Sequence, residues 1–323
     1  MTITSSAPGK LMFFGEHAVI QGYPCLVTSV DLRYQVSIDT IKEPEIFIQT
    51  PALEGRGEQF SIKVEDLTND ALSQQDTKFV LAVLQEMIPR SGYRKGFRIQ
   101  TTGPVTSYGL GSSSAISVAT VHAFSDLFSM QLPLDEIFQR AYAAVLKVQK
   151  TGSGFDVASA TFGGTIRYQI GMPIQKLTVG RLPVTIGFTG KKVSTVDLVK
   201  GVEDSKIRKP EIYNTFFQSI GEITESAQIA LLKKDWKDLG KLADLNQKVL
   251  AGMGVSTPAL ERGILAAKKA GAFGAKLSGA GGGDCMFAIR TVSQLEIEEA
   301  LEKTDIQVLH FGTNCEGVRL ESS

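Results

Sequence analysis

A turn rich in glycine, followed at once by three serines, limits the fold of this chain more than any other segment. It lies in residues 104–120, PVTSYGLGSSSAISVAT, directly before an apolar run with helical spacing. Gly109 and Gly111 can adopt positive φ and leave room for main-chain N–H groups to converge on an anion. A helix beginning near Ser112 adds unpaired N–H donors and the positive end of its dipole. The segment therefore predicts either a phosphate site or a simple change of chain direction.

The length and composition favour a globular protein with a small-molecule partner. The chain has 323 residues, 43% hydrophobic and 21% charged, which is enough for two domains. Lys plus Arg and Asp plus Glu both total 34, so the basic excess of a nucleic-acid-binding protein is missing. We expect no nucleic acid among its partners.

Cysteine usage and the N-terminal segment indicate a cytoplasmic protein. Cys25, Cys285 and Cys315 are odd in number and lack CxxC spacing, which argues against a disulfide framework or a structural zinc site. The start, MTITSSAPGKLMFF, has no basic region followed by a sustained apolar segment. We therefore expect no signal peptide and no membrane partner.

The order of periodic segments predicts a sheet-rich first half and a helix-rich second half. A hydroxyl N-cap at Thr257, followed by Pro258, predicts a helix start, and Gly271 predicts its end. We expect domains at residues 1–175 and 176–323. Strands are predicted at residues 25–38, 96–102, 164–170, 183–189 and 285–290, and helices at 112–128 and 134–147, with further helices up to about residue 250.

Three charged or polar side chains lie in a glycine-bounded turn near the N-terminus. The segment SAPGKLMFFGEHAVIQGYP carries Lys10, Glu16 and His17. A strand–turn–strand pattern of this kind presents such groups either to a cleft or to solvent. Asp156, after a Gly-Ser-Gly turn, is similarly open to two interpretations: a helix N-cap, or a carboxylate that accepts a proton from a substrate hydroxyl.

A third glycine-dense segment, KLSGAGGGDCMFAI, lies between two predicted strands at residues 276–289. Glycine is unfavourable inside a strand, so the segment predicts a loop that another part of the backbone approaches closely. Together, APGKLMFFGEHAV, YGLGSSSAISVAT and KLSGAGGGDCM resemble the three ordered motifs of the GHMP kinase superfamily. Within it, the chain resembles the mevalonate kinases and the related phosphomevalonate kinases along nearly its whole length.

The resemblance implies an α/β (α+β) two-domain GHMP kinase fold. The N-terminal domain would be ribosomal-protein-S5-like and the C-terminal domain ferredoxin-like, with ATP and Mg²⁺ bound between them. The implied activity is ATP-dependent phosphorylation of mevalonate in isoprenoid biosynthesis, and the implied assembly is a homodimer.

Residue roles follow from the resemblance by position. Asp156 would be the catalytic carboxylate, either a general base or an electrostatic anchor, and Lys10 its cationic partner. Ser113 would also bind Mg²⁺. The ATP-binding residues would be Pro104, Gly109, Leu110, Gly111, Ser112, Ser113 and Ser114. The substrate-binding residues would be Glu16, His17, Thr195, Gly279, Ala280 and Gly281.

Some positions depart from the mevalonate kinase pattern. Many mevalonate kinases carry a Mg²⁺-assisting glutamate eleven positions before the catalytic aspartate, where this chain has Val145. The GSGFD loop and Asp284 are closer to phosphomevalonate kinases, whereas GEHAV and GVSTPALE are closer to mevalonate kinases.

Mevalonate is the favoured acceptor, and two alternatives stay open. A phosphomevalonate acceptor would require additional cationic groups such as Lys191, Lys192 or Arg167. A nucleotide-binding sensor without turnover is a third hypothesis, which the intact set of Lys10, Ser113 and Asp156 disfavours.

Overall fold

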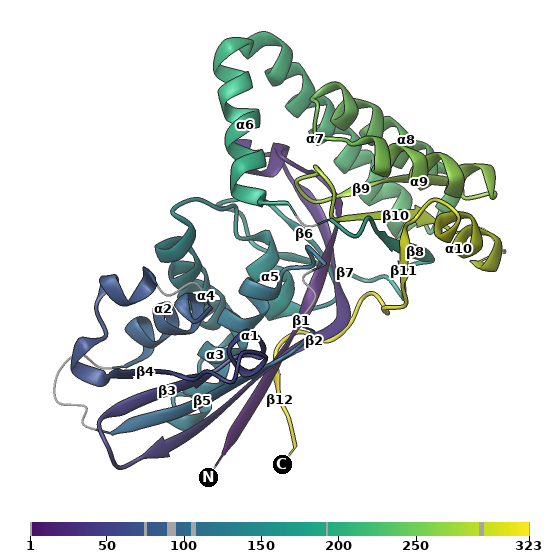
Figure 1. Cartoon of the computed structure of the whole chain (residues 1–323). Helices are drawn as coiled ribbons and strands as arrows, with labels where there is room; N and C mark the ends of the chain where they lie inside the picture. The colour runs from purple at the N-terminus through teal and green to yellow at the C-terminus, as the bar shows by residue number, and fades with distance from the viewer. Residues whose placement is uncertain are drawn as a thin grey trace.

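In the computed structural model of the protein, the alternating apolar residues of the N-terminal half build a large β-sheet (Figure 1). The structure describes residues 2–73, 76–88, 95–104, 108–191, 193–290 and 294–322. Within these ranges the sheet has eight strands, ordered β12-β1-β2-β5-β3-β4, with β6 paired to β2 and β7 to β6. The strands are β1 (Ile3–Phe14), β2 (Cys25–Ile41), β3 (Glu45–Gln49), β4 (Phe60–Lys63), β5 (Gly96–Thr102), β6 (Thr165–Tyr168), β7 (Gln175–Leu177) and β12 (Arg319–Leu320).

Strand β2 organises this sheet because it is long enough to pair with several neighbours. β1 runs antiparallel to it, β5 pairs with residues 35–41, and β6 pairs with residues 25–28. The register of β1 shifts just before Gly9. A Cβ on Gly9 would lie 2.9 Å from the Leu110 carbonyl oxygen, so the absence of a side chain lets the loop before α3 approach the strand. This approach brings Lys10 beside that loop.

Helices cover one face of the large sheet (Figure 1). Their apolar sides and the sheet bury a continuous core that includes Phe13, Phe97 and Phe124. The helices predicted at residues 112–128 and 134–147 are confirmed as α3 and α4. This layer consists of α2 (Lys78–Met87), α3 (Ser112–Leu127), α4 (Leu134–Gln149) and α5 (Phe155–Phe162), and shorter helices are α1 (Pro51–Glu54), η1 (Ala18–Gln21), η2 (Val64–Asp66) and η3 (Asn69–Ser73).

A second, antiparallel sheet has the strand order β11-β8-β10-β9. Its chain order, β8, helices, β9, β10, α10, β11, is that of a ferredoxin-like fold, so the predicted fold class is confirmed. The strands are β8 (Val184–Phe188), β9 (Gly274–Ser278), β10 (Cys285–Ile289) and β11 (Gln307–Leu309). The helices are α6 (Thr195–Arg208), α7 (Pro210–Leu232), α8 (Trp236–Gly252), α9 (Pro258–Lys269) and α10 (Gln294–Glu302).

The two sheets are joined by the N-terminal hairpin and by the C-terminal segment. The end of β1 reaches β9, and η1 packs against α7 (Figure 1). Strand β12 returns to pair with β1, so both termini lie at the large sheet. The predicted domain division after residue 175 falls within β7 and stays a prediction.

Candidate active site

The loop before α3 together with the first turn of that helix (residues 108–114, here the α3 loop) leaves several main-chain amides without partners among the described residues. Gly109 has φ 72° and Gly111, the N-cap of α3, has φ 85°. The first helical hydrogen bond runs from the Ala115 amide to the Gly111 carbonyl, at 3.0 Å. The amides of residues 112–114 therefore lack intrahelical partners, and the positive end of the helix dipole lies beside them. This arrangement suits an anion.

A cavity of about 410 Å³ opens beside the start of α3 and includes Pro104, Ser112 and Ser113 in its lining. The Tyr34 hydroxyl is hydrogen-bonded to Ser112, and burial raises the pKa of Tyr34 to about 12. The hydroxyl of Ser114 is buried and has no partner among the described residues. The rest of the lining is Tyr34, Thr50, Pro51, Ala52, Asp76, Lys78, Phe79, Val80, Thr101, Thr102, Gly103 and Ile116.

Sequence reasoning found only one wall of this cavity. Tyr34 and Thr101 were not predicted, because they belong to strands whose alternating pattern indicates a sheet and nothing more. Their position beside the α3 loop depends on strand pairing between distant segments, which no local motif encodes.

Lys10 lies where the three predicted motifs meet. It is 9% exposed, and its Nζ donates to the Gly109 carbonyl at 3.1 Å. Its main-chain amide donates to the Leu110 carbonyl at 2.8 Å. A Cβ on Gly279, in the third motif, would lie 3.9 Å from the same Nζ. The ammonium group also lies 5.4 Å from the ring centroid of Phe155, the residue before Asp156.

Asp156 is in the first turn of α5 and is half-buried. Its Oδ1 accepts a hydrogen bond from the Val157 amide at 3.0 Å. The N-cap interpretation of Asp156 is wrong, because Gly154, with φ 86°, occupies that position. The carboxylate instead accepts from a first-turn amide of α5, and the residue before it, Phe155, has its ring beside the Lys10 ammonium.

Glu16 is completely buried in an ion pair with Lys276. Asn246 Nδ2 donates to the other carboxylate oxygen at 3.3 Å. Burial raises the pKa of Glu16 and lowers the pKa of Lys276, and their mutual attraction opposes both shifts. The alternative of a solvated turn is wrong for Glu16. A substrate contact stays a prediction for it, and its carboxylate faces Lys276 and Asn246.

His17 follows Glu16 and connects the N-terminal hairpin to the third motif. Its Nε2 lies 2.9 Å from the Ala280 carbonyl. Burial lowers the pKa of His17, which favours the neutral ring, and the carbonyl can only accept, so Nε2–H is the donor. His17 has φ 60°, a left-handed conformation that turns the chain at the end of β1.

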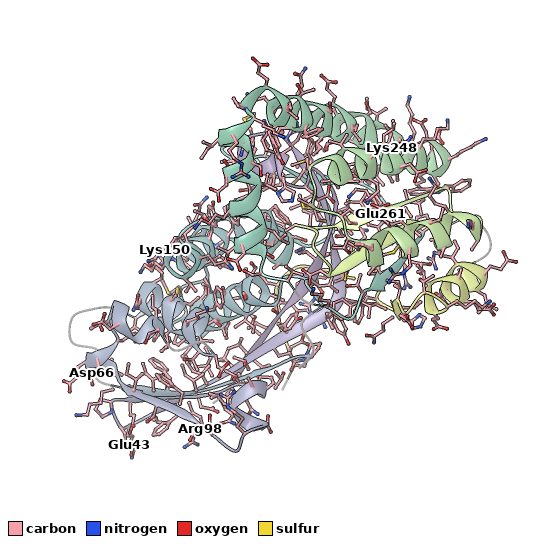
Figure 2. All side chains as sticks on the ribbon, turned by 45° about the horizontal axis from the view of Figure 1, so that its top comes forward. Glu43, Asp66, Arg98, Lys150, Lys248 and Glu261 are labelled. Atoms are coloured by element: carbon pink, nitrogen blue, oxygen red, sulfur yellow. The ribbon has the colours of Figure 1, made fainter. Side chains whose placement is uncertain are left out.

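The loop between β9 and β10 (residues 279–283, here the β9–β10 loop) packs against the segment before α9. A Cβ on Gly281 would lie 2.2 Å from the Val255 carbonyl oxygen, and the Gly282 amide donates to that oxygen at 2.7 Å. Glu261, labelled in Figure 2, accepts a hydrogen bond from Gln247 at 2.8 Å beside this segment. Gly279, Ala280 and Gly281 are thus held close to Lys10 and His17.

Thr195 is separate from this group. It is the first residue of α6, it is exposed, and Ser194 caps the helix by accepting from the Asp197 amide. The same end of α6 reaches the β9–β10 loop through Leu198, whose Cδ1 would lie 2.8 Å from a Cβ on Gly282. Among the described residues, no hydrogen bond joins Thr195 to the other predicted site residues.

The positions that depart from the mevalonate kinase pattern have distinct surroundings. Val145 is buried in the core side of α4. Asp284 is buried and has φ 51°. Its carboxylate packs against Gly109, where an added Cβ would lie 2.8 Å from Oδ2. Arg167 is paired with Glu225 at 2.7 Å. Lys191 is exposed, and Lys192 lies outside the described residues.

In the described part of the chain, no group of three or more His, Cys, Asp and Glu side chains is arranged to hold a metal ion. No helix in the same ranges is long and apolar enough to cross a lipid bilayer.

Comparison with known proteins identifies the family. The models of the GHMP kinase N-terminal and C-terminal domains match residues 78–164 and 227–305. The mevalonate kinase of Thermococcus sibiricus is 32% identical over 330 residues, which cover 99% of this chain and 99% of that protein. The chain belongs to the GHMP kinase family. The predicted resemblance is therefore confirmed.

Solved structures share this fold. The mevalonate kinase of Methanococcus jannaschii superposes with a TM-score of 0.81 at 26% identity, covering 98% of each chain. A phosphomevalonate kinase of Streptococcus pneumoniae, solved with phosphomevalonate and AMPPNP, has a TM-score of 0.77 at 19% identity and covers 97% of this chain and 99% of that one. The second likeness concerns the fold alone.

Proposed function

We propose that this protein is a mevalonate kinase, which transfers the γ-phosphoryl group of ATP to the primary hydroxyl of mevalonate. The position of Lys10 carries the proposal. Its ammonium contacts the Gly109 carbonyl of the α3 loop and the ring of Phe155, next to Asp156. A lysine ammonium beside an anion-binding loop can stabilise the charge on a transferring phosphoryl group.

In the proposed reaction, the acceptor oxygen attacks the γ-phosphorus of ATP, the bond to the bridging oxygen breaks, and ADP leaves. The α3-loop amides and Lys10 stabilise the phosphate charge. Asp156 orients the acceptor hydroxyl or takes its proton. His17 and the β9–β10 loop form the proposed wall against which mevalonate binds, and the cavity beside Ser112 and Ser113 receives the nucleotide.

Mg²⁺ is the proposed metal partner of ATP. This ion takes few protein ligands and retains waters and phosphate oxygens, so it does not need a dense carboxylate cluster. The Ser113 hydroxyl lines the cavity and provides a suitable oxygen, whereas Val145 provides none. When bound, the ion neutralises phosphate charge. The donor set therefore fits Mg²⁺.

Mevalonate is preferred to phosphomevalonate as the acceptor. The Thermococcus relative named a mevalonate kinase is 32% identical, whereas the pneumococcal phosphomevalonate kinase is 19% identical. Among the cations that a phosphorylated acceptor would require, Arg167 is already paired with Glu225. These observations support the smaller, unphosphorylated substrate.

The remaining proposals concern the setting of the enzyme. We propose a cytoplasmic homodimer with domains at residues 1–175 and 176–323. Free thiols at Cys25, Cys285 and Cys315 support a reducing compartment. Exposed apolar side chains on α7 and α8, Ile229 and Leu245, support a second copy as partner.

The test is ATP consumption by the purified protein with Mg²⁺ and mevalonate, phosphomevalonate or no acceptor, with the products identified by mass. We expect turnover with mevalonate only. Asp156→Asn should lower kcat by at least about 10³-fold while circular dichroism shows a folded protein. Turnover only with phosphomevalonate would transfer the assignment to that acceptor, and nucleotide binding without any product would identify a sensor.

A further inference from the structure

The turn between α4 and α5 is held by two tyrosine hydroxyl groups. Tyr142, on α4, donates to the Gly152 carbonyl at 2.7 Å. Tyr168, on β6, donates to the next carbonyl, that of Ser153, at 2.5 Å. The two side chains come from different secondary-structure elements and reach consecutive peptide groups of one turn. Figure 2 labels Lys150, at the end of α4 where this turn begins.

The same two rings enclose the residue that starts the next helix. Gly154 has φ 86°, and a Cβ on it would lie 3.0 Å from Tyr142 Cε2 and 3.0 Å from the Tyr168 hydroxyl. A side chain at this position would be both strained and obstructed. The main chain therefore passes close to the two tyrosines immediately before Phe155 and Asp156.

The first turn of α5 follows this turn directly. The helix has eight residues, Phe155–Phe162, and Asp156 is in its first turn. Residues 157–161 are buried and hold the body of the helix against the core, whereas helix ends are less ordered, so the first turn depends more on the peptide groups that precede it. On α4, Val145 lies three residues after Tyr142, on the same helix face, and has no polar atom. On this face of α4, it is therefore Tyr142 that makes a hydrogen bond to the turn, whereas the Val145 side chain cannot.

Both hydroxyls remain hydrogen-bond donors under working conditions. Burial raises the pKa of Tyr142 and of Tyr168, and the negative charge of Asp156 contributes to both shifts. An un-ionised phenol donates to a carbonyl, whereas a phenolate would repel it. The direction of these shifts agrees with the geometry of the turn.

We propose that Tyr142 and Tyr168 are positioning residues for phosphoryl transfer: their hydroxyls hold the Gly152 and Ser153 carbonyls and thereby fix Asp156 against the acceptor. This proposal rests on the proposed function, because it takes Asp156 as the group that orients the acceptor. It predicts that removing one oxygen atom from either ring slows the chemical step without weakening substrate binding.

The experiment compares Tyr142→Phe, Tyr168→Phe and the double variant with the wild type in single-turnover phosphorylation of mevalonate. We expect each single change to lower the single-turnover rate about 10-fold and the double change about 100-fold. In steady-state kinetics, the KM for ATP and the KM for mevalonate should both stay within about twofold of the wild type. Tyr213→Phe is the matched control, because its hydroxyl also donates to a backbone carbonyl, that of Met253, at 3.2 Å. It should keep the wild-type rate.

A second measurement does not depend on turnover. The Val157 amide donates to Asp156 Oδ1, so hydrogen exchange in the peptide covering residues 152–157 reports the order of this turn. Exchange should rise in both tyrosine variants and stay unchanged in Tyr213→Phe. Unchanged exchange in a folded Tyr142→Phe protein overturns the proposal. This half-exposed position keeps the test decisive even where Tyr168→Phe does not fold.

The outcomes separate the two proposals. If the wild type phosphorylates mevalonate and Asp156→Asn does not, wild-type rates in both tyrosine variants overturn the positioning role alone. The same follows if these variants lose rate only in proportion to a raised KM or to the loss of folded protein. If the wild type does not use mevalonate, the proposed function fails and the catalytic role of the tyrosines fails with it, while the exchange measurement still decides whether their hydroxyls order the turn.

Discussion

The α3 loop and the β9–β10 loop are both rich in glycine, but their glycines serve different neighbours. In the α3 loop, the amides of residues 112–114 lack helical partners, and Ser112 and Ser113 line an open cavity. In the β9–β10 loop, Gly281 lies against the Val255 carbonyl, and the Gly282 amide already donates to it. The first loop offers donors to a ligand, whereas the second uses its donors to hold protein segments together.

This difference shows why glycine content alone does not identify a binding loop. Glycine permits positive φ in both loops, so the same residue type serves ligand binding in one loop and close packing in the other. What distinguishes them is whether the N–H groups and hydroxyls nearby have protein partners. Substitutions should therefore affect ligand binding or turnover in the α3 loop, with a smaller loss of stability than in the β9–β10 loop.

The largest expected effect is on stability, from Gly281→Val. The residue has φ 86°, and its Cβ would lie 2.2 Å from a main-chain oxygen that cannot easily move. We expect the free energy of unfolding in urea to fall by at least about 3 kcal/mol. Gly57→Val is the control, because Gly57 has φ 67° and no heavy atom within 4 Å of its added Cβ. An equal loss of unfolding free energy in the two variants would contradict the claim that close packing at Gly281 stabilises the fold.

Gly111→Ala should cost less. This residue also has positive φ, 85°, but its Cβ would meet Lys10 Cγ at 3.0 Å, and a flexible side chain can shift. We expect a loss of about 1–2 kcal/mol in the free energy of unfolding. The displaced Lys10 should lower kcat about 10-fold. Urea titration and steady-state kinetics measure the two effects, and a stability loss as large as that of Gly281→Val would erase the contrast between the loops.

Acid should destabilise the folded protein at His17, because protonation would place a charge in a buried position. Burial lowers the pKa of His17 below its ordinary value of 6.5. Below about pH 6.5 the unfolded chain therefore binds more protons than the folded one, and stability falls as pH falls towards the folded pKa. The slope contributed by His17 should approach about 1.4 kcal/mol per pH unit.

Thermal unfolding between pH 7.5 and 5.5 tests this expectation. His17→Asn should reduce the dependence of stability on pH. His310→Gln, at a mostly exposed position, should leave the dependence intact. If stability fell more steeply with falling pH in His17→Asn than in the wild type, the claim that burial lowers the pKa of His17 would be contradicted.

The smallest expected change comes from Ser114→Ala. The Ser114 hydroxyl is buried without a partner among the described residues, which costs free energy in the ligand-free protein. Its removal should raise the free energy of unfolding by up to about 1 kcal/mol and weaken nucleotide binding about 10-fold. Ser117→Ala is the control, since the Ser117 hydroxyl donates to the Ser113 carbonyl at 2.9 Å. A stability loss with unchanged nucleotide affinity would show that the hydroxyl serves the core.

Local sequence signals predicted much of the fold. Thr257 caps α9 by accepting from the Leu260 amide, Pro258 is the first helical residue, and Gly271 follows the helix with φ 93°. These signals act over a few residues, so the sequence displays them directly. The strands at residues 25–38 and 96–102 were equally visible in their alternation.

Long-range contacts in the site were not predictable in this way. Glu16 and Lys276 are far apart in sequence, and no local pattern indicates that a lysine in β9 becomes the partner of a glutamate after β1. The hydroxyl contacts of Tyr142 and Tyr168 also depend on how α4 and β6 pack around one turn. The sequence identified the motif residues, while their mutual orientation came from tertiary packing.

Nucleotide binding to Ser113→Asp tests the α3 loop most directly. An acidic residue in the first turn of α3 interacts favourably with the helix dipole, by about 0.3–1 kcal/mol, so the variant should be at least as stable as the wild type. The same charge repels phosphate. Calorimetric titration with Mg²⁺ and AMPPNP should show at least about 100-fold weaker binding than to the wild type. An affinity within about twofold of the wild type in the folded variant would contradict the claim that this loop holds the nucleotide phosphates.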